Sequence, residues 1–180
     1  SRLQGHPTTH EKLPGIRIAS GSLGQGISVA IGSALSKKLN KDDKLVYVLV
    51  GDGELQEGQN WEAIMFASAK NIDNLILCVD LNGKQIDGST SEVLPIGNLK
   101  IKFEAFGWKV IEIENGNNLE SIIEKLNEAK NAGYYPRVLS QASDVKIAKT
   151  IVHGSIGKEK VMNFVAKVGH FKFSGGRNDN

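Results

Sequence analysis

Two uninterrupted apolar runs stand out in the first half of the chain, at residues 45–50 and 75–79. Each contains β-branched residues and is bounded by polar residues or glycine, which is typical of a strand buried on both faces of a sheet. Residues 59–70 lie between the two runs and carry apolar side chains at helical spacing. The pattern predicts a unit of strand, loop, helix and strand with a right-handed crossover.

Helical and strand patterns alternate along most of the remaining chain. Helical periodicity predicts helices over residues 26–39, 99–106 and 119–130, and further strands are expected at residues 109–113 and within 145–152. Asn117 with Glu120 resembles a capping box in front of the last of these helices. The predicted fold class is α/β, a doubly wound and mostly parallel sheet with helices on both faces.

Two segments do not carry a strong periodic pattern. Residues 1–20 are expected to be a loop with a short extended piece at 16–18, and the Ser- and Thr-containing residues 88–96 are expected to be a second loop. The sequence shows no internal repeat and no linker, so residues 1–180 are expected to form a single domain.

Composition is that of a folded chain rather than a disordered or membrane one. Of the 180 residues, 40% are hydrophobic and 23% are charged. No apolar stretch reaches the roughly 18 residues that a membrane span needs, and no basic and then apolar leader opens the chain. The single Cys78 leaves no intramolecular disulfide and fits a reducing compartment. We therefore expect a cytoplasmic protein that does not bind membranes.

The net charge of +2 comes from nearly balanced acidic and basic residues. Nucleic-acid binders usually carry a strong basic footprint with interleaved aromatic side chains, and this chain has neither. We expect no nucleic-acid partner.

Candidate chemistry follows the two apolar runs. Asp52 lies between Gly51 and Gly53 directly after the first run, and Asn82 follows the second. Parallel strands bring their carboxyl ends to one edge, where open α/β sheets bind ligands. A carboxylate and an amide oxygen suit Mg²⁺, which takes its other ligands from phosphates and water. The glycines let the backbone approach phosphate oxygens, so the sequence predicts a Mg²⁺-diphosphate site.

At this point the chain resembles a known family. Residues 51–53 with Asn82-Gly83 match the thiamine diphosphate motif, and residues 54–58 and 80–88 resemble transketolase specifically. Gly5-His6-Pro7 and residues 21–26 resemble two upstream transketolase segments, in the family's order. The likeness is greatest to the split transketolases whose amino-terminal half is a separate polypeptide. It implies the thiamine diphosphate-binding fold, with residues 137–180 as a divergent tail and the family's preceding amino-terminal segment lacking.

The resemblance implies a role for each matching residue. It implies that Asp52, Asn82 and the main-chain carbonyl of Lys84 hold Mg²⁺. The residues that it places against thiamine diphosphate are Gly21, Leu23, Gly51, Asp52, Gly53, Glu54, Asn82 and Ile86. It implies that His6 faces the diphosphate and the substrate, and that Glu57 lies at a subunit interface near the active site.

Each assignment has a plainer structural alternative. His6 could be an exposed loop histidine, and Leu23 and Ile86 could be ordinary core residues. Glu57 could be an acid placed in a first helical turn by the helix dipole. These alternatives differ in the burial that they predict.

The resemblance also implies a division of labour between chains. In the family, the glutamate that activates the aminopyrimidine comes from another domain, so a carboxy-terminal transketolase subunit or pyrimidine-binding domain is the expected partner, in an oligomer. The implied function is transfer of a two-carbon ketol unit between sugar phosphates. The alternatives are another thiamine diphosphate enzyme (a deoxyxylulose phosphate synthase or a 2-oxoacid dehydrogenase component) and a catalytically silent truncated relic.

Overall fold

The computed structural model describes residues 6–132 and the backbone of residues 137–142. The chain forms two compact units, one of Ser1–Gly21 with Lys149–Asn180 and the other of Ser22–Ala148. In the described part of the first unit, residues 6–21 contain no helix or strand, so the extended piece predicted at 16–18 is not a strand. A bond from the Ser20 amide to the Pro7 carbonyl (3.0 Å) closes this loop on itself.

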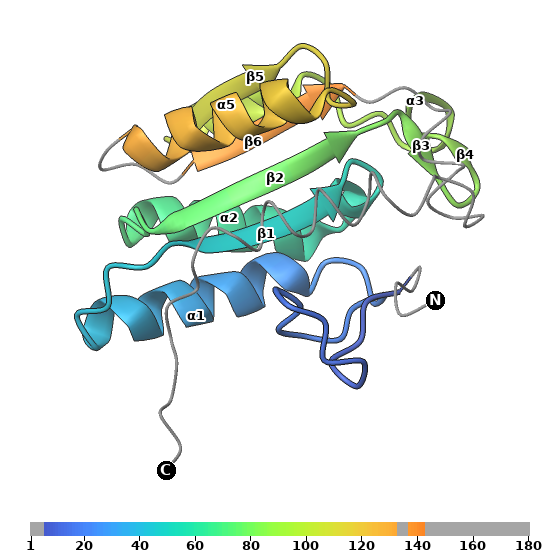
Figure 1. The fold of residues 1–180 in the computed structure, drawn as a ribbon. Coiled ribbons are helices and arrows are strands. Elements are labelled where there is room, and N and C mark those ends of the chain that lie inside the picture. The colour runs from blue at the N-terminus through green and yellow to red at the C-terminus, as the bar shows by residue number, and fades with distance from the viewer. Residues whose placement is uncertain (1–5, 133–136, 143–180) are drawn as a thin grey trace. The chain divides into compact units, whose positions relative to one another are not determined.

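The second unit is built on a four-stranded parallel sheet (Figure 1). Its strands pair in the order β1, β2, β6, β5, which are Val46–Gly51, Leu75–Leu81, Arg137–Ala142 and Lys109–Ile113. β1, β2 and β5 form where the apolar runs predict them. β6 begins earlier than the strand predicted within 145–152, a segment that lies outside the described residues.

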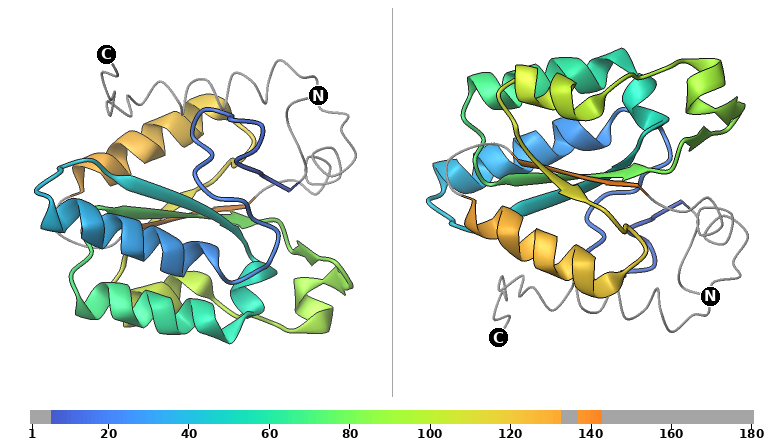
Figure 2. Two further views of the ribbon diagram at one scale, coloured as in Figure 1. Left: turned by 90° about the horizontal axis from the view of Figure 1, so that it is seen from below. Right: turned by 90° about the horizontal axis from the view of Figure 1, so that it is seen from above.

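Helices cover both faces of this sheet, as Figure 2 shows. α2 (Gly58–Ala69) and α4 (Leu99–Ala105) lie on one face and α5 (Leu119–Asn131) on the other, while α1 (Gly26–Leu39) packs against β1 and α2. The helices lie within two residues of their predicted bounds at each end. The prediction of a doubly wound α/β sheet is confirmed.

Asparagine side chains begin two of these helices. The Asn98 side chain accepts a bond from the Ile101 amide (3.0 Å), and the Asn118 side chain accepts one from the Ser121 amide (2.8 Å). The cap of α5 is therefore Asn118, and the capping box predicted from Asn117 is wrong by one residue. Both side chains satisfy backbone donors that the first helical turn leaves free.

The segment after β2 forms a small structure of its own. β3 (Lys84–Gln85) and β4 (Gly88–Ser89) pair as an antiparallel hairpin, and the short helix α3 (Thr90–Val93) follows directly. The loop predicted over residues 88–96 is therefore partly ordered. A 3-10 turn, η1 (Glu54–Gln56), follows β1.

The core lies between α1, α2, α4 and one face of the sheet. An aromatic group of Trp61, Phe103, Phe106 and Trp108 joins α2 to α4, with ring centroids 5.7 to 6.1 Å apart. The two indole N–H groups donate to the Leu55 and Ile64 carbonyls, so neither is left unsatisfied in the core.

β1 departs from the expectation of a strand buried on both faces. It lies at an edge of the sheet, and Leu49 is 63% exposed. Cys78 on β2 is partly rather than fully buried, and burial raises the pKa of its thiol to about 12. Among the described residues, no helix combines the length and the apolar character needed to cross a bilayer.

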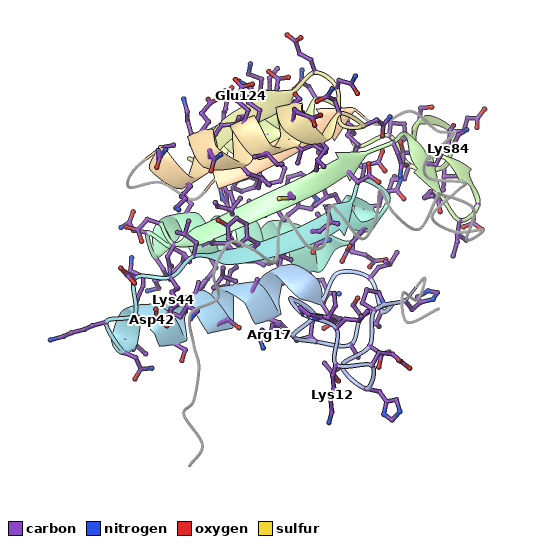
Figure 3. All side chains as sticks on the ribbon, in the orientation of Figure 1. Lys12, Arg17, Asp42, Lys44, Lys84 and Glu124 are labelled. Atoms are coloured by element: carbon purple, nitrogen blue, oxygen red, sulfur yellow. The ribbon has the colours of Figure 1, made fainter. Side chains whose placement is uncertain are left out.

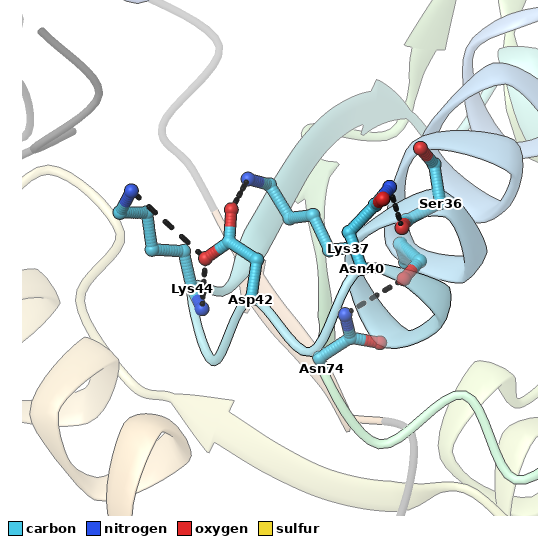
Figure 4. Close-up of polar contacts among 7 residues, drawn as sticks. Ser36, Lys37, Asn40, Asp42, Lys44 and Asn74 are labelled. Atoms are coloured by element: carbon cyan, nitrogen blue, oxygen red, sulfur yellow. Dashed lines mark hydrogen bonds and ion pairs between the residues drawn. The ribbon is translucent and has the colours of Figure 1, made fainter.

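The chain enters β1 through a tight polar turn (Figure 4). Lys37 of α1 donates to Asp42 (2.7 Å), and the Lys44 amide bonds the same carboxylate (3.0 Å). The Asn74 side chain, placed just before β2, donates to the Ala34 carbonyl of α1 (2.9 Å). These contacts fix how α1, β1 and β2 meet at the amino end of the sheet.

Candidate functional site

The carboxy ends of β1 and β2 lie level with each other. Gly51 pairs with Asp80 in the parallel register, and the Asp52 amide donates to the Asp80 carbonyl (3.1 Å). The Gly83 amide in turn donates to an Asp52 carboxylate oxygen (2.8 Å). The structure therefore brings the turn that follows Asp52 and the turn that contains Asn82 together at one edge of the sheet.

The Asp52 carboxylate is enclosed by backbone and hydroxyl donors. Oδ1 accepts from the Gly53 amide (2.9 Å), while Oδ2 accepts from the Gly83 amide and, at 3.4 Å, from the Thr90 hydroxyl. The residue is 0% exposed. Three elements therefore converge on one carboxylate, namely the end of β1, the turn after β2 and the start of α3.

This carboxylate carries an uncompensated charge. Burial raises the pKa of Asp52, the nearby Asp80 carboxylate adds to that shift, and the three donors oppose it. In the part of the chain that the structure describes, no lysine, arginine or histidine forms an ion pair with Asp52. A buried carboxylate without a cation is unfavourable unless a positive group joins it, so the site fits a bound metal ion.

Asn82 and Lys84 complete the same turn. Asn82 Oδ1 accepts from the Lys84 amide (2.8 Å), and its Nδ2 donates to the Asp80 carboxylate (3.1 Å). Lys84 begins the hairpin at the edge of the molecule (Figure 3). Among the described residues, no three His, Cys, Asp or Glu side chains gather around a common point. A metal here would thus take amide, main-chain, phosphate and water oxygens beside Asp52, which suits Mg²⁺.

The two glycines beside Asp52 differ in what surrounds them. A Cβ on Gly53 would lie 2.5 Å from the Gln85 Cβ and 3.4 Å from the Lys84 carbonyl oxygen, whereas a Cβ on Gly51 would meet nothing within 4 Å. The hairpin therefore packs directly on the Gly53 backbone. Gly53 has a steric reason to be glycine, and Gly51 has none among the described residues.

Exposure distinguishes the two interpretations of Leu23 and Ile86. Leu23 is 50% exposed and Ile86 is 96% exposed, so the alternative that they are core residues is wrong. Glu57 is exposed at the start of α2, and its side chain makes no capping bond there. Exposed aliphatic side chains beside a polar site can pack on the apolar part of a ligand.

Two predicted residues, His6 and Gly21, belong to the other unit. A Cβ on Gly21 would lie 2.8 Å from the His6 ring, so the imidazole lies against the Gly21 backbone. His6 itself is exposed. Because the two units are described separately, the roles of His6 and Gly21 toward the diphosphate stay predictions.

The sequence patterns miss three contributors. They place Thr90 in a loop, yet it is buried and donates to Asp52. They place Gln59 only in a helix, yet its side-chain amide donates to the Leu23 carbonyl (3.4 Å). They give the Glu54 side chain no partner, yet its carboxylate accepts from the Gly24 amide (3.0 Å). No spacing rule connects these pairs, because each contact joins segments that only the fold brings together.

Comparisons with known proteins agree with this geometry. The family model described as the thiamine diphosphate binding domain of transketolase matches residues 1–172. One of the two subunits of an apulose-4-phosphate transketolase from Phocaeicola vulgatus is 40% identical over 139 residues, which cover 77% of this chain and 48% of that protein. A 6-deoxy-6-sulfo-D-fructose transketolase subunit of a Clostridium species is 43% identical over 125 residues, 69% of this chain and 45% of that protein.

A solved structure gives the same result for the fold. The transketolase of Campylobacter jejuni superposes with a TM-score of 0.71 at 32% sequence identity, covering 94% of this chain and 28% of that one. The chain spans about half the length of the curated subunits that it matches and a smaller share of this longer transketolase.

Proposed function

The chain belongs to the transketolase family, as a thiamine diphosphate-binding domain, and from this premise we propose that it holds the Mg²⁺-diphosphate end of the cofactor in a two-chain transketolase. The observation that carries the proposal is the buried Asp52 carboxylate, which has donors on both oxygens but no cation among the described residues. A divalent cation would supply the missing positive charge.

Each element at this edge has a defined task in the proposal. Asp52, Asn82 and the Lys84 carbonyl hold Mg²⁺, and the Gly53 and Glu54 amides donate to diphosphate oxygens. Leu23 and Ile86, both exposed, pack on the cofactor rings and exclude water from them. When bound, thiamine diphosphate supplies the nucleophilic carbon that accepts and passes on a two-carbon ketol unit.

The proposed assembly needs a second polypeptide. The relatives named above are called subunits, and this chain covers about half of each. A carboxy-terminal subunit would supply the pyrimidine-binding domain and the glutamate that activates the aminopyrimidine. The chain alone is expected to be inactive. The cytoplasmic location predicted from the sequence stays a prediction.

The proposed substrates are a ketose phosphate or a related anionic ketose as donor and an aldose phosphate as acceptor. The names of the relatives indicate apulose 4-phosphate and 6-deoxy-6-sulfo-D-fructose as substrates of those proteins. Both molecules are ketoses that carry an anionic group away from the carbonyl. The donor panel for this chain should therefore include them beside xylulose 5-phosphate.

The test is a reconstituted ketol transfer assay. The full chain is mixed with the carboxy-terminal subunit of a two-subunit relative, Mg²⁺ and thiamine diphosphate, and each donor is supplied with ribose 5-phosphate. We expect transfer that requires both chains, and a loss of at least about 100-fold for Asp52→Ala. Product formation from pyruvate instead of a ketose would favour a deoxyxylulose phosphate synthase. Cofactor binding that is undetectable even with the second chain would favour a silent relic.

A further inference from the structure

The short segment Leu23-Gly24, which leads into α1, is held at two points by the segment that follows Asp52. The Gly24 amide donates to Glu54 Oε1 (3.0 Å), and Gln59 Nε2 donates to the Leu23 carbonyl (3.4 Å). One bond is made by a backbone donor and the other by a backbone acceptor. Together they fix the peptide group that joins Leu23 to Gly24.

The Gln59 side chain also lies across Gly24. A Cβ on Gly24 would come within 2.5 Å of Gln59 Nε2 and 3.1 Å of its Cγ and Cδ. Gly24 is buried and has a φ of +84°, a conformation that glycine adopts without strain. The segment therefore has the backbone shape and the absence of a side chain that this close packing requires.

The turn that carries Glu54 is itself well fixed. The Glu54 carbonyl accepts from Asn60 Nδ2 (2.6 Å) and from the Glu57 amide (3.1 Å), and the Leu55 amide donates to the Asp52 carbonyl (3.1 Å). Leu55 is fully buried beneath this turn. The position of Leu23 is therefore tied, through Glu54, to the same turn that presents Asp52.

The charge of Glu54 argues for a role away from the metal. A free carboxylate next to a diphosphate would repel it, whereas one that accepts a backbone N–H has part of its charge stabilised. The hydrogen bond places the Glu54 carboxylate on Gly24, while the buried negative charge at the strand ends is that of Asp52. Glu54 is thus arranged as a link between two loops.

We propose that Glu54 and Gln59 are positioning residues that hold the exposed Leu23 side chain in place for the cofactor rings. The inference rests on the proposed function and adds to it a division of the site. The Asp52 turn recognises the metal and diphosphate, and the link through Glu54 and Gln59 sets the place of the ring contact. Breaking the link should impair recognition of the rings while leaving recognition of the diphosphate intact.

The first test needs no cofactor. In the cofactor-free full chain, hydrogen exchange of the Gly24 amide is followed by NMR for the wild type, Glu54→Ala and Glu54→Gln. We expect Glu54→Ala to speed exchange at Gly24 by about tenfold or more, and Glu54→Gln, which keeps an acceptor oxygen, to restore much of the protection. The matched control is Glu62→Ala, because Glu62 is exposed on α2. Equal exchange at Gly24 in the wild type and Glu54→Ala would overturn the link.

The second test separates the rings from the diphosphate. Mg²⁺ with thiamine diphosphate and Mg²⁺ with inorganic pyrophosphate are titrated by calorimetry into each variant, with the second subunit present. We expect Glu54→Ala to weaken thiamine diphosphate binding about tenfold and Gln59→Ala to weaken it about threefold, with pyrophosphate binding unchanged in both. An equal loss for the two ligands would overturn the positioning role.

A wild type that binds neither ligand would instead contradict the proposed function. The exchange of the Gly24 amide would still decide whether the link exists, so the two failures remain distinguishable.

Discussion

Two aspartates stand at the two ends of β1, and their surroundings are opposite. Asp42, before the strand, is partly exposed and lies 2.7 Å from Lys37 and 3.9 Å from Lys44, as Figure 4 shows. The hydrogen bond from Lys37 is the main cause that lowers the pKa of Asp42. Asp52, after the strand, is fully buried with no ion pair among the described residues, and burial raises its pKa.

The contrast separates a structural carboxylate from one arranged for a ligand. At the amino end, the charge is balanced by lysines of the same chain, and the contacts serve only to join α1 to β1. At the carboxy end, the fold gathers amide donors around a carboxylate but leaves its charge unbalanced. Such a group is unfavourable in the free protein and becomes favourable when a cation binds.

Substitution of Gly53 should have the largest effect on this contrast. A Cβ at Gly53 would lie 2.5 Å from the Gln85 Cβ, so Gly53→Ala must displace the hairpin. We expect a loss of about 2 kcal/mol of unfolding free energy and weaker cofactor binding. Chemical unfolding and calorimetry measure the two effects.

The control for Gly53→Ala is Gly32→Ala in α1, where a Cβ would meet nothing within 4 Å. That change should stabilise the protein by about 0.5–1 kcal/mol, because alanine is the better helix former. A similar response of the two variants would show that the hairpin is not packed on Gly53.

Removal of Ile86 should affect binding without affecting the fold. Because Ile86 is 96% exposed in the free chain, Ile86→Ala should leave the melting temperature unchanged and weaken Mg²⁺-thiamine diphosphate binding about tenfold. Leu39, 84% exposed at the end of α1 away from the site, is the matched control, and Leu39→Ala should change neither quantity. Unchanged affinity in Ile86→Ala would remove Ile86 from the ring contact.

Loss of the Thr90 hydroxyl should have an effect of about 1 kcal/mol, because Thr90→Val keeps the shape of the buried side chain but removes the donor to Asp52 Oδ2. The carboxylate is then held less firmly. Thr90→Ser keeps the donor and is the control. Affinity for Mg²⁺-thiamine diphosphate should fall in the first variant and be largely retained in the second. A loss in both would indicate a packing role for the methyl group instead.

The smallest effect is expected at Asp42, and it depends on pH. The pKa of Asp42 is lowered below 3.8, so its pairing contributes stability above that pH, which is lost as the pH falls through the lower folded pKa. Asp42→Asn should therefore be slightly less stable than the wild type at pH 7 and equally stable at the acid end. The raised pKa of Asp52 has the opposite sign, because that carboxylate makes the free protein less stable as the pH rises. Unfolding curves from about pH 2.5 to 7 measure both trends.

Local patterns are enough to predict most of the fold. The helical period of α1 and α5 and the apolar runs of β1 and β2 place those elements within two residues, because each pattern reflects burial along one element. β6 is predicted too late, since Ser140 and Gln141 lie within the strand although they look like an interruption of it. The edge position of β1 is not predictable in this way, because strand order is a property of the whole sheet.

The site is predictable to the extent that strand ends determine it. Asp52 and the turn after β2 meet as predicted, since parallel strands in register must end at one edge. The contacts of Thr90, Gln59 and the Glu54 carboxylate could not be predicted, because each depends on how loops distant in sequence pack on one another. The order of the hairpin likewise depends on packing against Gly53.

One measurement tests the central claim directly. Mg²⁺-thiamine diphosphate is titrated calorimetrically, with the second subunit present, into the wild type, Asp42→Asn and Asp52→Asn. Both variants remove one carboxylate at an end of β1, so they differ only in the surroundings of that carboxylate. We predict that Asp42→Asn binds like the wild type and that Asp52→Asn loses at least about 100-fold in affinity. Unchanged affinity in Asp52→Asn would contradict the account.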